Sequence, residues 1–572
     1  MADPKIIYHV RMPQPANHYF EIEMHLNDFG QEIITLVMPV WTPGSYLVRE
    51  YSKNVEAVSA KSVSGEIIPV DKIAKNKWQV NTAKNIIISY RVYAFEASVR
   101  TCLLDADHAS IAPAGLFMYA ENMDCPFYLN IHPPADWKEI STSLEKIDND
   151  PWKRKAINRD TLYDSPIEIG NHKVHHFSAA GVNHELAIYG AGNYSVEKLL
   201  IDFPKMVEEE VKIFQHHPCR DYLFILLNSN SLRGGLEHLF STSLIFRRFQ
   251  YTPENNYKEF LSLVAHEYFH LWNVKRLRPA ALGPFKYDEE NYTSSLWIAE
   301  GFTSYYDDLI LRRCNFYSER AYLDVLEKNI NDTLNPPGNF VQSVGEASFD
   351  AWIKYYRQNE NSSNAQVNYY VKGSVLAMIL DIIIIHYSSG EHSLDNVMRE
   401  AYHTFYSELN RGYTEEEFKS ILEKYAGENL NWFYQDHVFG TRQPDIKKYL
   451  ALMGVEAINA NENAIESDLG IIVNNKNTIS QIRKNSTGEK AGLNVNDEII
   501  AIDGFRFAEN FLQTIMMGRK INDQLSITVS RNGILKEFKA IIQTTDVVNM
   551  KLNMLTDAPE EQILLYRKWL AV

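Results

Sequence analysis

The segment LSLVAHEYFHLW, residues 261–272, carries His266, Glu267 and His270 within an otherwise apolar stretch. On an α-helix, residues four positions apart lie on one face, so both imidazoles can point at the same atom. Neutral imidazole is a good zinc ligand, and a glutamate beside the first histidine can reach a metal-bound water as general base. The segment therefore predicts a helix with a catalytic zinc site. The alternative is an ordinary amphipathic helix with two hydrogen-bonded histidines.

A catalytic zinc ion takes three protein ligands and leaves one position for water. Glu300, in WIAEGFTSYYDD (297–308), is the predicted third ligand because its neighbours in the sequence are apolar, which is unusual for an exposed helix glutamate. No cysteine lies near the histidine motif, whereas structural zinc sites fill all four positions with protein ligands, often cysteine. We therefore expect one Zn²⁺ ion, held by His266, His270 and Glu300.

The composition is that of a globular protein and excludes some classes of partner. The chain has 572 residues, of which 45% are hydrophobic and 23% charged, and this length predicts several domains. A net charge of −16 without a basic block argues against nucleic acid. The four scattered cysteines, the lack of a signal-like start and the short apolar run 375–385, broken by Asp381, predict a cytoplasmic chain with no membrane span.

The first half of the chain changes from strand patterns to mixed patterns. Residues 1–168 alternate in strand fashion between turn clusters, which predicts a β-sandwich-like domain. Beyond it, 197–216 predicts a helix and 221–227 and 241–246 predict strands, so that Gly234 to His238 are expected at a sheet edge. Adjacent glycines there allow another backbone to approach closely. Residues 292–314 predict a second long helix.

The second half is helical and ends in a compact β unit. Helices are expected at 318–334, 371–388 and 415–437, with a long loop region between 336 and 368. A linker is expected at 455–466, followed by short strands with regular turns. The string AGLNVNDEIIAIDG, residues 491–504, resembles part of the PDZ fold. The predicted divisions are 169–315 for the catalytic domain, 316–455 for its helical part, 456–545 for the PDZ-like unit and 546–572 for a tail packed on another domain.

Four motifs in order, RGGLEH, HEYFHLW, WIAEGFTSYYDD and NYYVKG, together resemble the M61 metallopeptidases, the glycyl aminopeptidase family of the gluzincin clan. WTPGSY (41–46) and DSPIEIG (164–170) extend the resemblance into the amino-terminal domain. The resemblance implies a multidomain α+β protein with a thermolysin-like catalytic domain. It also implies zinc ligands at His266, His270 and Glu300, with Glu267 as the base.

The resemblance implies further roles near the metal. RGGLEH is similar to the GxMEN segment of aminopeptidase N enzymes, so Glu237 is expected to bind the substrate's free α-amino group, beside Gly234, Gly235 and Leu236. Leu236 and His238 depart from the methionine and asparagine of that pattern. NYYVKG is similar to YxKG, in which a tyrosine stabilises the oxyanion. Tyr370 is the candidate, and Tyr369 is its alternative.

These features predict a zinc aminopeptidase, and the resemblance implies that it removes small amino-terminal residues such as glycine or alanine from peptides. A second hypothesis is a zinc endopeptidase whose PDZ-like unit recruits protein carboxyl termini by strand addition near Asp468 to Ile471. A third is a non-catalytic PDZ scaffold protein. Peptides with a free amino terminus are the expected partners of the first, and a peptide or protein carboxyl terminus is the expected partner of the PDZ-like unit.

Overall fold

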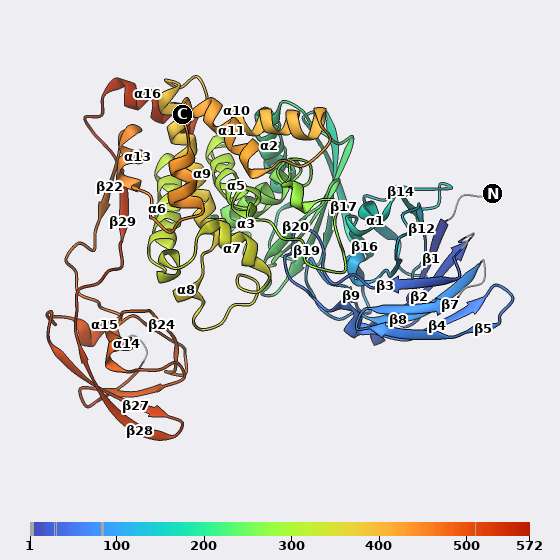
Figure 1. Cartoon of the computed structure of the whole chain (residues 1–572), viewed down its shortest axis with the longest axis horizontal. Helices are drawn as coiled ribbons and strands as arrows, with labels where there is room; N and C mark the ends of the chain where they lie inside the picture. Colours follow the sequence, from blue (N-terminus) through green and yellow to red (C-terminus); the bar gives the residue numbers. More distant parts are fainter. Residues whose placement is uncertain (1–4, 28, 30, 82–84, 509–510, 572) are drawn as a thin grey trace. The chain divides into compact units, whose positions relative to one another are not determined.

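A computed structural model describes residues 5–27, 29, 31–81, 85–508 and 511–571 (Figure 1). The chain divides into two compact units. The first comprises Met1–Tyr292, Cys314–Phe316 and Met398–Thr414. The second comprises Thr293–Arg313, Tyr317–Val397 and Glu415–Val572.

An eight-stranded sheet in the order β14-β15-β12-β1-β2-β8-β4-β5 opens the first unit. Ile6, Tyr8 and Val10 alternate along β1 and are fully buried, as expected for a strand with one covered face. The same buried cluster contains Leu36 and Trp78 of a second sheet, ordered β11-β3-β7-β6, so two sheets share one core. The strands of the first sheet are β1 (Lys5–Arg11), β2 (Tyr19–Asn27), β4 (Val55–Ser62), β5 (Ile67–Ile68), β8 (Ile86–Tyr93), β12 (Phe127–His132), β14 (Glu145–Lys146) and β15 (Lys153–Ala156). Those of the second are β3 (Ile33–Val37), β6 (Val70–Ala74), β7 (Lys77–Asn81) and β11 (Tyr119–Ala120). The predicted β-rich domain is confirmed.

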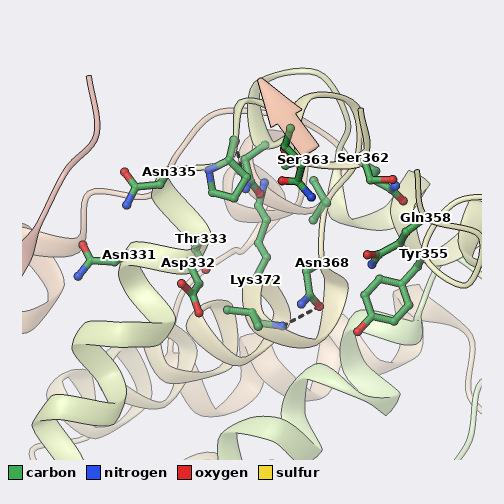
Figure 2. Close-up of a pocket in the computed structure, with 16 residues that line it drawn as sticks. Asn331, Asp332, Thr333, Asn335, Tyr355, Gln358, Ser362, Ser363, Asn368 and Lys372 are labelled. Carbon is green, nitrogen blue, oxygen red and sulfur yellow. Dashed lines mark hydrogen bonds between the residues drawn. The ribbon is translucent and has the colours of Figure 1, made fainter. Parts of the chain in front are cut away.

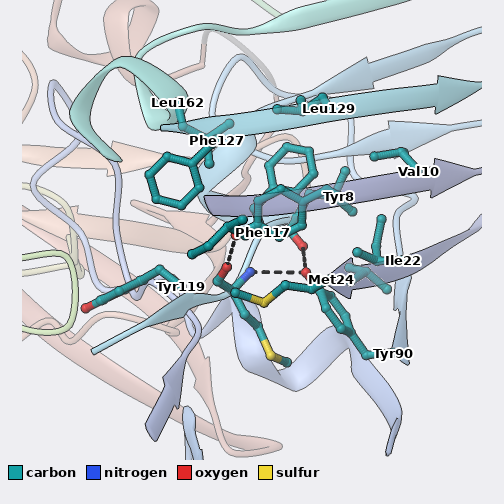
Figure 3. Close-up of a cluster of buried hydrophobic side chains, with 14 of the residues drawn as sticks. Tyr8, Val10, Ile22, Met24, Tyr90, Phe117, Tyr119, Phe127, Leu129 and Leu162 are labelled. Carbon is teal, nitrogen blue, oxygen red and sulfur yellow. Dashed lines mark hydrogen bonds between the residues drawn. The ribbon is translucent and has the colours of Figure 1, made fainter. Parts of the chain in front are cut away.

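Buried tyrosine hydroxyls bind the backbone within this core (Figure 3). Tyr90 donates to the carbonyl oxygen of Leu116 and accepts from the N–H of Met118, both at 3.1 Å. Tyr8 donates to the carbonyl oxygen of Met118. These hydrogen bonds satisfy polar atoms that would otherwise be costly to bury.

A five-stranded mixed sheet, β17-β18-β19-β21-β20, forms the rest of the first unit with its helices. β18 (Val182–Tyr189), β19 (Asp221–Ser229) and β21 (Ser241–Arg247) are parallel, and β20 (Gly234–Glu237) is an antiparallel edge strand beside β21. β17 (Lys173–Ala179) is the other edge. α2 (Val196–Phe214) contacts β17, and α3 (Glu254–Phe269) contacts β20 and β21. The predicted strands and the edge position of Gly234 are confirmed.

The second unit is built around α9 (Tyr369–Tyr387), which contacts α5 (Gly301–Arg313), α6 (Glu319–Leu334), α11 (Glu415–Ala426) and α13 (Ile446–Leu452). α9 is long and apolar enough to cross a membrane, but 83% of its most apolar 18-residue window is buried inside the protein. It is therefore the core helix of this unit. The helix expected at 415–437 is shorter than predicted, because α11 ends before Gly427, whose φ is +69°. A short helix, α12 (Asn431–Phe433), and a π-turn (Tyr434–Val438) follow.

The PDZ-like unit has its own apolar core, which includes Leu469, Ile499 and Leu525. Its elements are β23 (Ile471–Val473), β24 (Ile479–Ile482), α14 (Thr487–Ala491), β25 (Glu498–Ile502), β26 (Phe505–Arg506), α15 (Phe511–Met516), β27 (Gln524–Arg531) and β28 (Ile534–Ile541).

The linker predicted before this unit was wrong at its start, whereas the predicted tail packs on the helices as expected and contains more regular structure than a tail. Residues 455–459 of the expected linker form β22 (Val455–Asn459), which pairs antiparallel with β29 (Met550–Met554). The expected tail contains β29 and α16 (Glu560–Leu570), whose buried Trp569 donates to the Tyr305 hydroxyl at 2.8 Å. The pairing joins residues 91 to 99 positions apart in sequence, so no local pattern predicts it.

Candidate metal centre

α3 places the two motif histidines side by side. His266 lies in its last turn and His270 is its C-cap residue, with helical backbone angles and its N–H bonded to the carbonyl oxygen of His266 at 3.3 Å. The two Nε2 atoms are 3.1 Å apart. The Nδ1–H of His270 donates to the carbonyl oxygen of Asn273 at 2.9 Å, which leaves its Nε2 with a lone pair.

This arrangement fits a metal ion. At Zn–N distances of about 2.0–2.1 Å, tetrahedral geometry separates two ligand nitrogens by about 3.3 Å. The observed separation of 3.1 Å is close to that value. A backbone carbonyl that fixes the other ring nitrogen is the support that metal-binding histidines usually have.

Glu267 lies beside these histidines and is buried, with 5% of its surface exposed. Burial raises the pKa of Glu267 to about 7, and the His266 and His270 imidazoles partly oppose that rise. A carboxyl group with a pKa near neutrality can both accept and return a proton.

Gly235 of β20 lies against this carboxylate. A Cβ atom at Gly235 would lie 2.1 Å from Glu267 Oε1, whereas a Cβ atom at Gly234 would meet nothing closer than 3.6 Å. The sequence predicted the close approach of another backbone at the paired glycines, but it is the Glu267 side chain that approaches, at Gly235 alone, and this contact requires glycine.

Glu237, also on β20, is the second acidic group in this region. Its side chain is buried, and Oε1 has no hydrogen-bond partner among the described residues. One ligand atom each of Glu237, Glu267 and His270 lie within 4.8 Å of one another. Two buried carboxylates at this distance repel each other, so a cation or an ammonium group placed there would be stabilised.

Leu236 differs from its neighbours on β20. It is 1% exposed and belongs to an apolar cluster with Leu223 and Ile245. Because side chains alternate along a strand, Gly235 and Glu237 share the opposite side of β20. The substrate-binding role of Leu236 stays a prediction.

Two residues close to these carboxylates had no predicted role. A Cβ atom at Gly44 would lie 2.5 Å from both carboxylate oxygens of Glu237, and Gly44 has φ +86°. Arg100 donates from Nη2 to the carbonyl oxygen of Gly235 at 2.9 Å, and its charge opposes a small part of the rise in the pKa of Glu267. Gly44 belongs to the WTPGSY motif, so the family resemblance could have pointed to it. No sequence pattern points to Arg100.

A buried charged cluster supports the end of β20. Asp164 accepts from Lys275 Nζ at 2.6 Å, from His238 Nδ1 at 3.2 Å and from the N–H of Leu239 at 2.6 Å. Burial alone would raise the pKa of Asp164, but the Lys275 ammonium and His238 lower it to about 2. The cluster therefore holds the DSPIEIG segment, the turn after Glu237 and the loop after α3 together.

Glu300 belongs to the second unit. The sequence predicted one long helix over 292–314, but Glu300 lies between two helices. α4 (Leu296–Ala299) ends at Glu300 and α5 begins at Gly301. A Cβ atom at Gly301 would lie 2.5 Å from the Cα atom of Gly373, so α9 passes too close for a larger residue there. Glu300 is 2% exposed, which agrees with the prediction that it is not a surface glutamate.

Tyr370 lies in the first turn of α9, and its hydroxyl is 3.2 Å from that of Tyr356. Burial, followed by the Glu300 carboxylate, raises the pKa of Tyr370 well above its ordinary value. The hydroxyl therefore stays protonated and can donate a hydrogen bond. Tyr369 is fully buried next to it.

Comparison with known proteins gives the family. Residues 259–376 match the model of M61 glycyl aminopeptidases, 7–171 the M61 N-terminal domain and 451–542 a PDZ domain. An aminopeptidase N family protein from Idiomarina loihiensis is 30% identical, with a TM-score of 0.92 over 99% of this chain and 100% of that one. The chain belongs to the M61 glycyl aminopeptidase family. As a member of it, the chain is a metallopeptidase with a PDZ domain, which removes the non-catalytic scaffold hypothesis.

More distant solved structures share the fold of this chain. An M1 zinc metallopeptidase from Deinococcus radiodurans is 12% identical, with a TM-score of 0.50 over 77% of this chain and 95% of that one. At this identity the likeness concerns the fold alone. No curated protein matches the chain.

Proposed function

We propose that this metallopeptidase is an aminopeptidase that binds one zinc ion through His266, His270 and Glu300. The observation that carries the proposal is the buried Glu237 carboxylate, with an unpartnered Oε1, within 4.8 Å of Glu267 and His270 ligand atoms. A peptide's amino-terminal ammonium group would satisfy that carboxylate next to the catalytic base.

Each residue has a defined part in the reaction. Zinc, when bound, lowers the pKa of a coordinated water to about 7 and polarises the scissile carbonyl. Glu267 accepts the water's proton and passes it to the leaving amine, a transfer that suits its pKa of about 7. Tyr370 donates a hydrogen bond to the developing oxyanion.

Glu237 gives the exopeptidase specificity. A buried carboxylate pairs with an ammonium group, whereas a mid-chain peptide would leave it unpaired and desolvated. The proposed preference for small residues such as glycine or alanine comes from the family's description as glycyl aminopeptidases. The ligand of the PDZ domain is proposed to be a peptide carboxyl terminus.

The base assignment is tested with Glu267→Gln. The variant should retain one zinc per chain while kcat/KM falls by about 100-fold or more, because the amide cannot accept the proton. Metal analysis and single-substrate kinetics measure both quantities. Turnover close to wild type would end the assignment of Glu267.

Exopeptidase and endopeptidase activities are separated by comparing alanyl-alanine amide with its N-acetylated form. Only the free amine should be cleaved, since acetylation removes the charge that Glu237 binds. Equal cleavage of the two would show that Glu237 does not bind an amine, and would favour the endopeptidase hypothesis.

A further inference from the structure

A polar pocket of about 320 Å³ lies within the second unit (Figure 2). Its walls come from α6, the turn Pro337–Phe340, α8 (Ser362–Ala365) and the start of α9, with Gln481 of β24 from the PDZ domain. Asparagine, glutamine and serine side chains make up most of its lining.

Four buried polar atoms of the lining have no hydrogen-bond partner among the described residues. They are Lys372 Nζ, Asn339 Oδ1, Gln366 Oε1 and Thr333 Oγ1. Leaving one such atom unpaired costs on the order of 1–3 kcal/mol, more if it is charged. One pocket that gathers four of them is therefore prepared for a polar ligand.

Lys372 is the charged group among them. It is 1% exposed, and Figure 2 shows its side chain extending between the helix that carries Thr333 and the segment that carries Asn368. Burial lowers the pKa of Lys372 to about 8, with no compensating rise from a carboxylate of the described chain. Asp332, on the wall of the pocket, pairs with Lys328 instead. Among the residues that the structure describes, the ammonium therefore has no counter-ion.

The lining selects the chemistry of the ligand. One ammonium balances a single negative charge, and Asp332 disfavours the double charge of a phosphate. The Asn339 and Gln366 oxygens accept hydrogen bonds, so the ligand must also carry N–H groups. A carboxylate next to N–H donors is the carboxyl end of an amino acid or a peptide.

We propose that this pocket is a second, non-catalytic site for the carboxyl end of a free amino acid or short peptide, with Lys372 Nζ binding the carboxylate and Asn339 and Gln366 accepting its N–H groups. The proposal rests on this pocket alone and does not depend on the zinc mechanism.

The site lies where the helices meet the PDZ domain. Asn364 of α8 donates to the carbonyl oxygen of Ile482 at 2.8 Å and accepts from the N–H of Lys484 at 2.9 Å. Gln481 lines the pocket next to this contact. A ligand bound there contacts both parts and stabilises their junction.

Calorimetric titration of the full-length protein tests the site with three probes. The first probe, N-acetyl-alanyl-alanine, has a free carboxylate and a blocked amino terminus. The second, N-acetyl-alanyl-alanine amide, lacks the negative charge. The third, free alanine, tests whether the ligand is an amino acid. The acid is expected to bind and the amide is not, because only the acid satisfies Lys372. Binding by alanine alone would assign the site to amino acids, and binding by the acetylated dipeptide alone would assign it to peptide ends.

Two variants locate the binding. Lys372→Met removes the ammonium, and Gln366→Glu adds a negative charge at nearly constant shape, which serves if the first variant fails to fold. Each variant should lower the affinity for N-acetyl-alanyl-alanine by about tenfold or more, as expected for the loss of a charged hydrogen bond. Lys447→Met removes an exposed lysine of the same unit and should leave binding unchanged.

Equal binding of the acid and the amide, or no binding of any probe, excludes a carboxylate site. Undiminished binding by folded Lys372→Met, or by Gln366→Glu, would place the carboxylate elsewhere in the protein, such as the PDZ domain.

Discussion

At the scale of single residues, Gly235 is the position where one added carbon should matter most. Its Cβ atom would lie 2.1 Å from Glu267 Oε1, so Gly235→Ala must displace the base. Misplacing a catalytic group by about 1 Å can cost on the order of 100-fold. We expect kcat/KM to fall by about that factor while the metal content stays unchanged.

Gly234→Ala is the matched control, since its added carbon would meet nothing closer than 3.6 Å on the same strand. It should retain activity close to that of the wild type. Equal losses in the two variants would mean that the strand, and not the contact with Glu267, is sensitive to substitution.

At the scale of elements, Asp164 joins three segments through Lys275, His238 and the N–H of Leu239. Asp164→Asn leaves the buried Lys275 charge uncompensated, which should cost about 3–5 kcal/mol of unfolding free energy. Denaturant unfolding measures this loss. Asp148→Asn, which removes the exposed partner of Lys153, should cost less than about 1 kcal/mol.

The same cluster predicts acid sensitivity. The pKa of Asp164 falls from 3.8 to about 2 on folding, so its contribution to stability is complete above about pH 4 and is lost as the pH falls towards 2. Asp164→Asn should therefore show a smaller loss of stability than the wild type between these pH values. Parallel curves for the two proteins would contradict the assigned role.

The elements also show what local sequence can predict. The strands at 221–227 and 241–246 and the edge position of Gly234 followed from local apolar patterns and turns. The division of the 292–314 segment into α4 and α5 at Glu300 was not predicted from the local sequence. Contacts such as Arg100 with Gly235 link residues 135 positions apart and leave no periodic signal.

At the scale of the whole molecule, metal removal tests the number of ions. A chelator should abolish peptide cleavage, and one equivalent of zinc per chain should restore it, because a single catalytic ion is proposed. Titration of the metal-free protein with zinc, followed by activity, measures the stoichiometry. Full recovery only at two equivalents would require a second ion.

The ligand set is the central claim, and X-ray anomalous scattering at the zinc absorption edge tests it most directly. One strong peak within about 2.3 Å of donor atoms of His266, His270 and Glu300 is the result we predict. A peak bound by the two histidines with Glu300 distant from it, or no peak beside them in a zinc-loaded active crystal, would contradict the account.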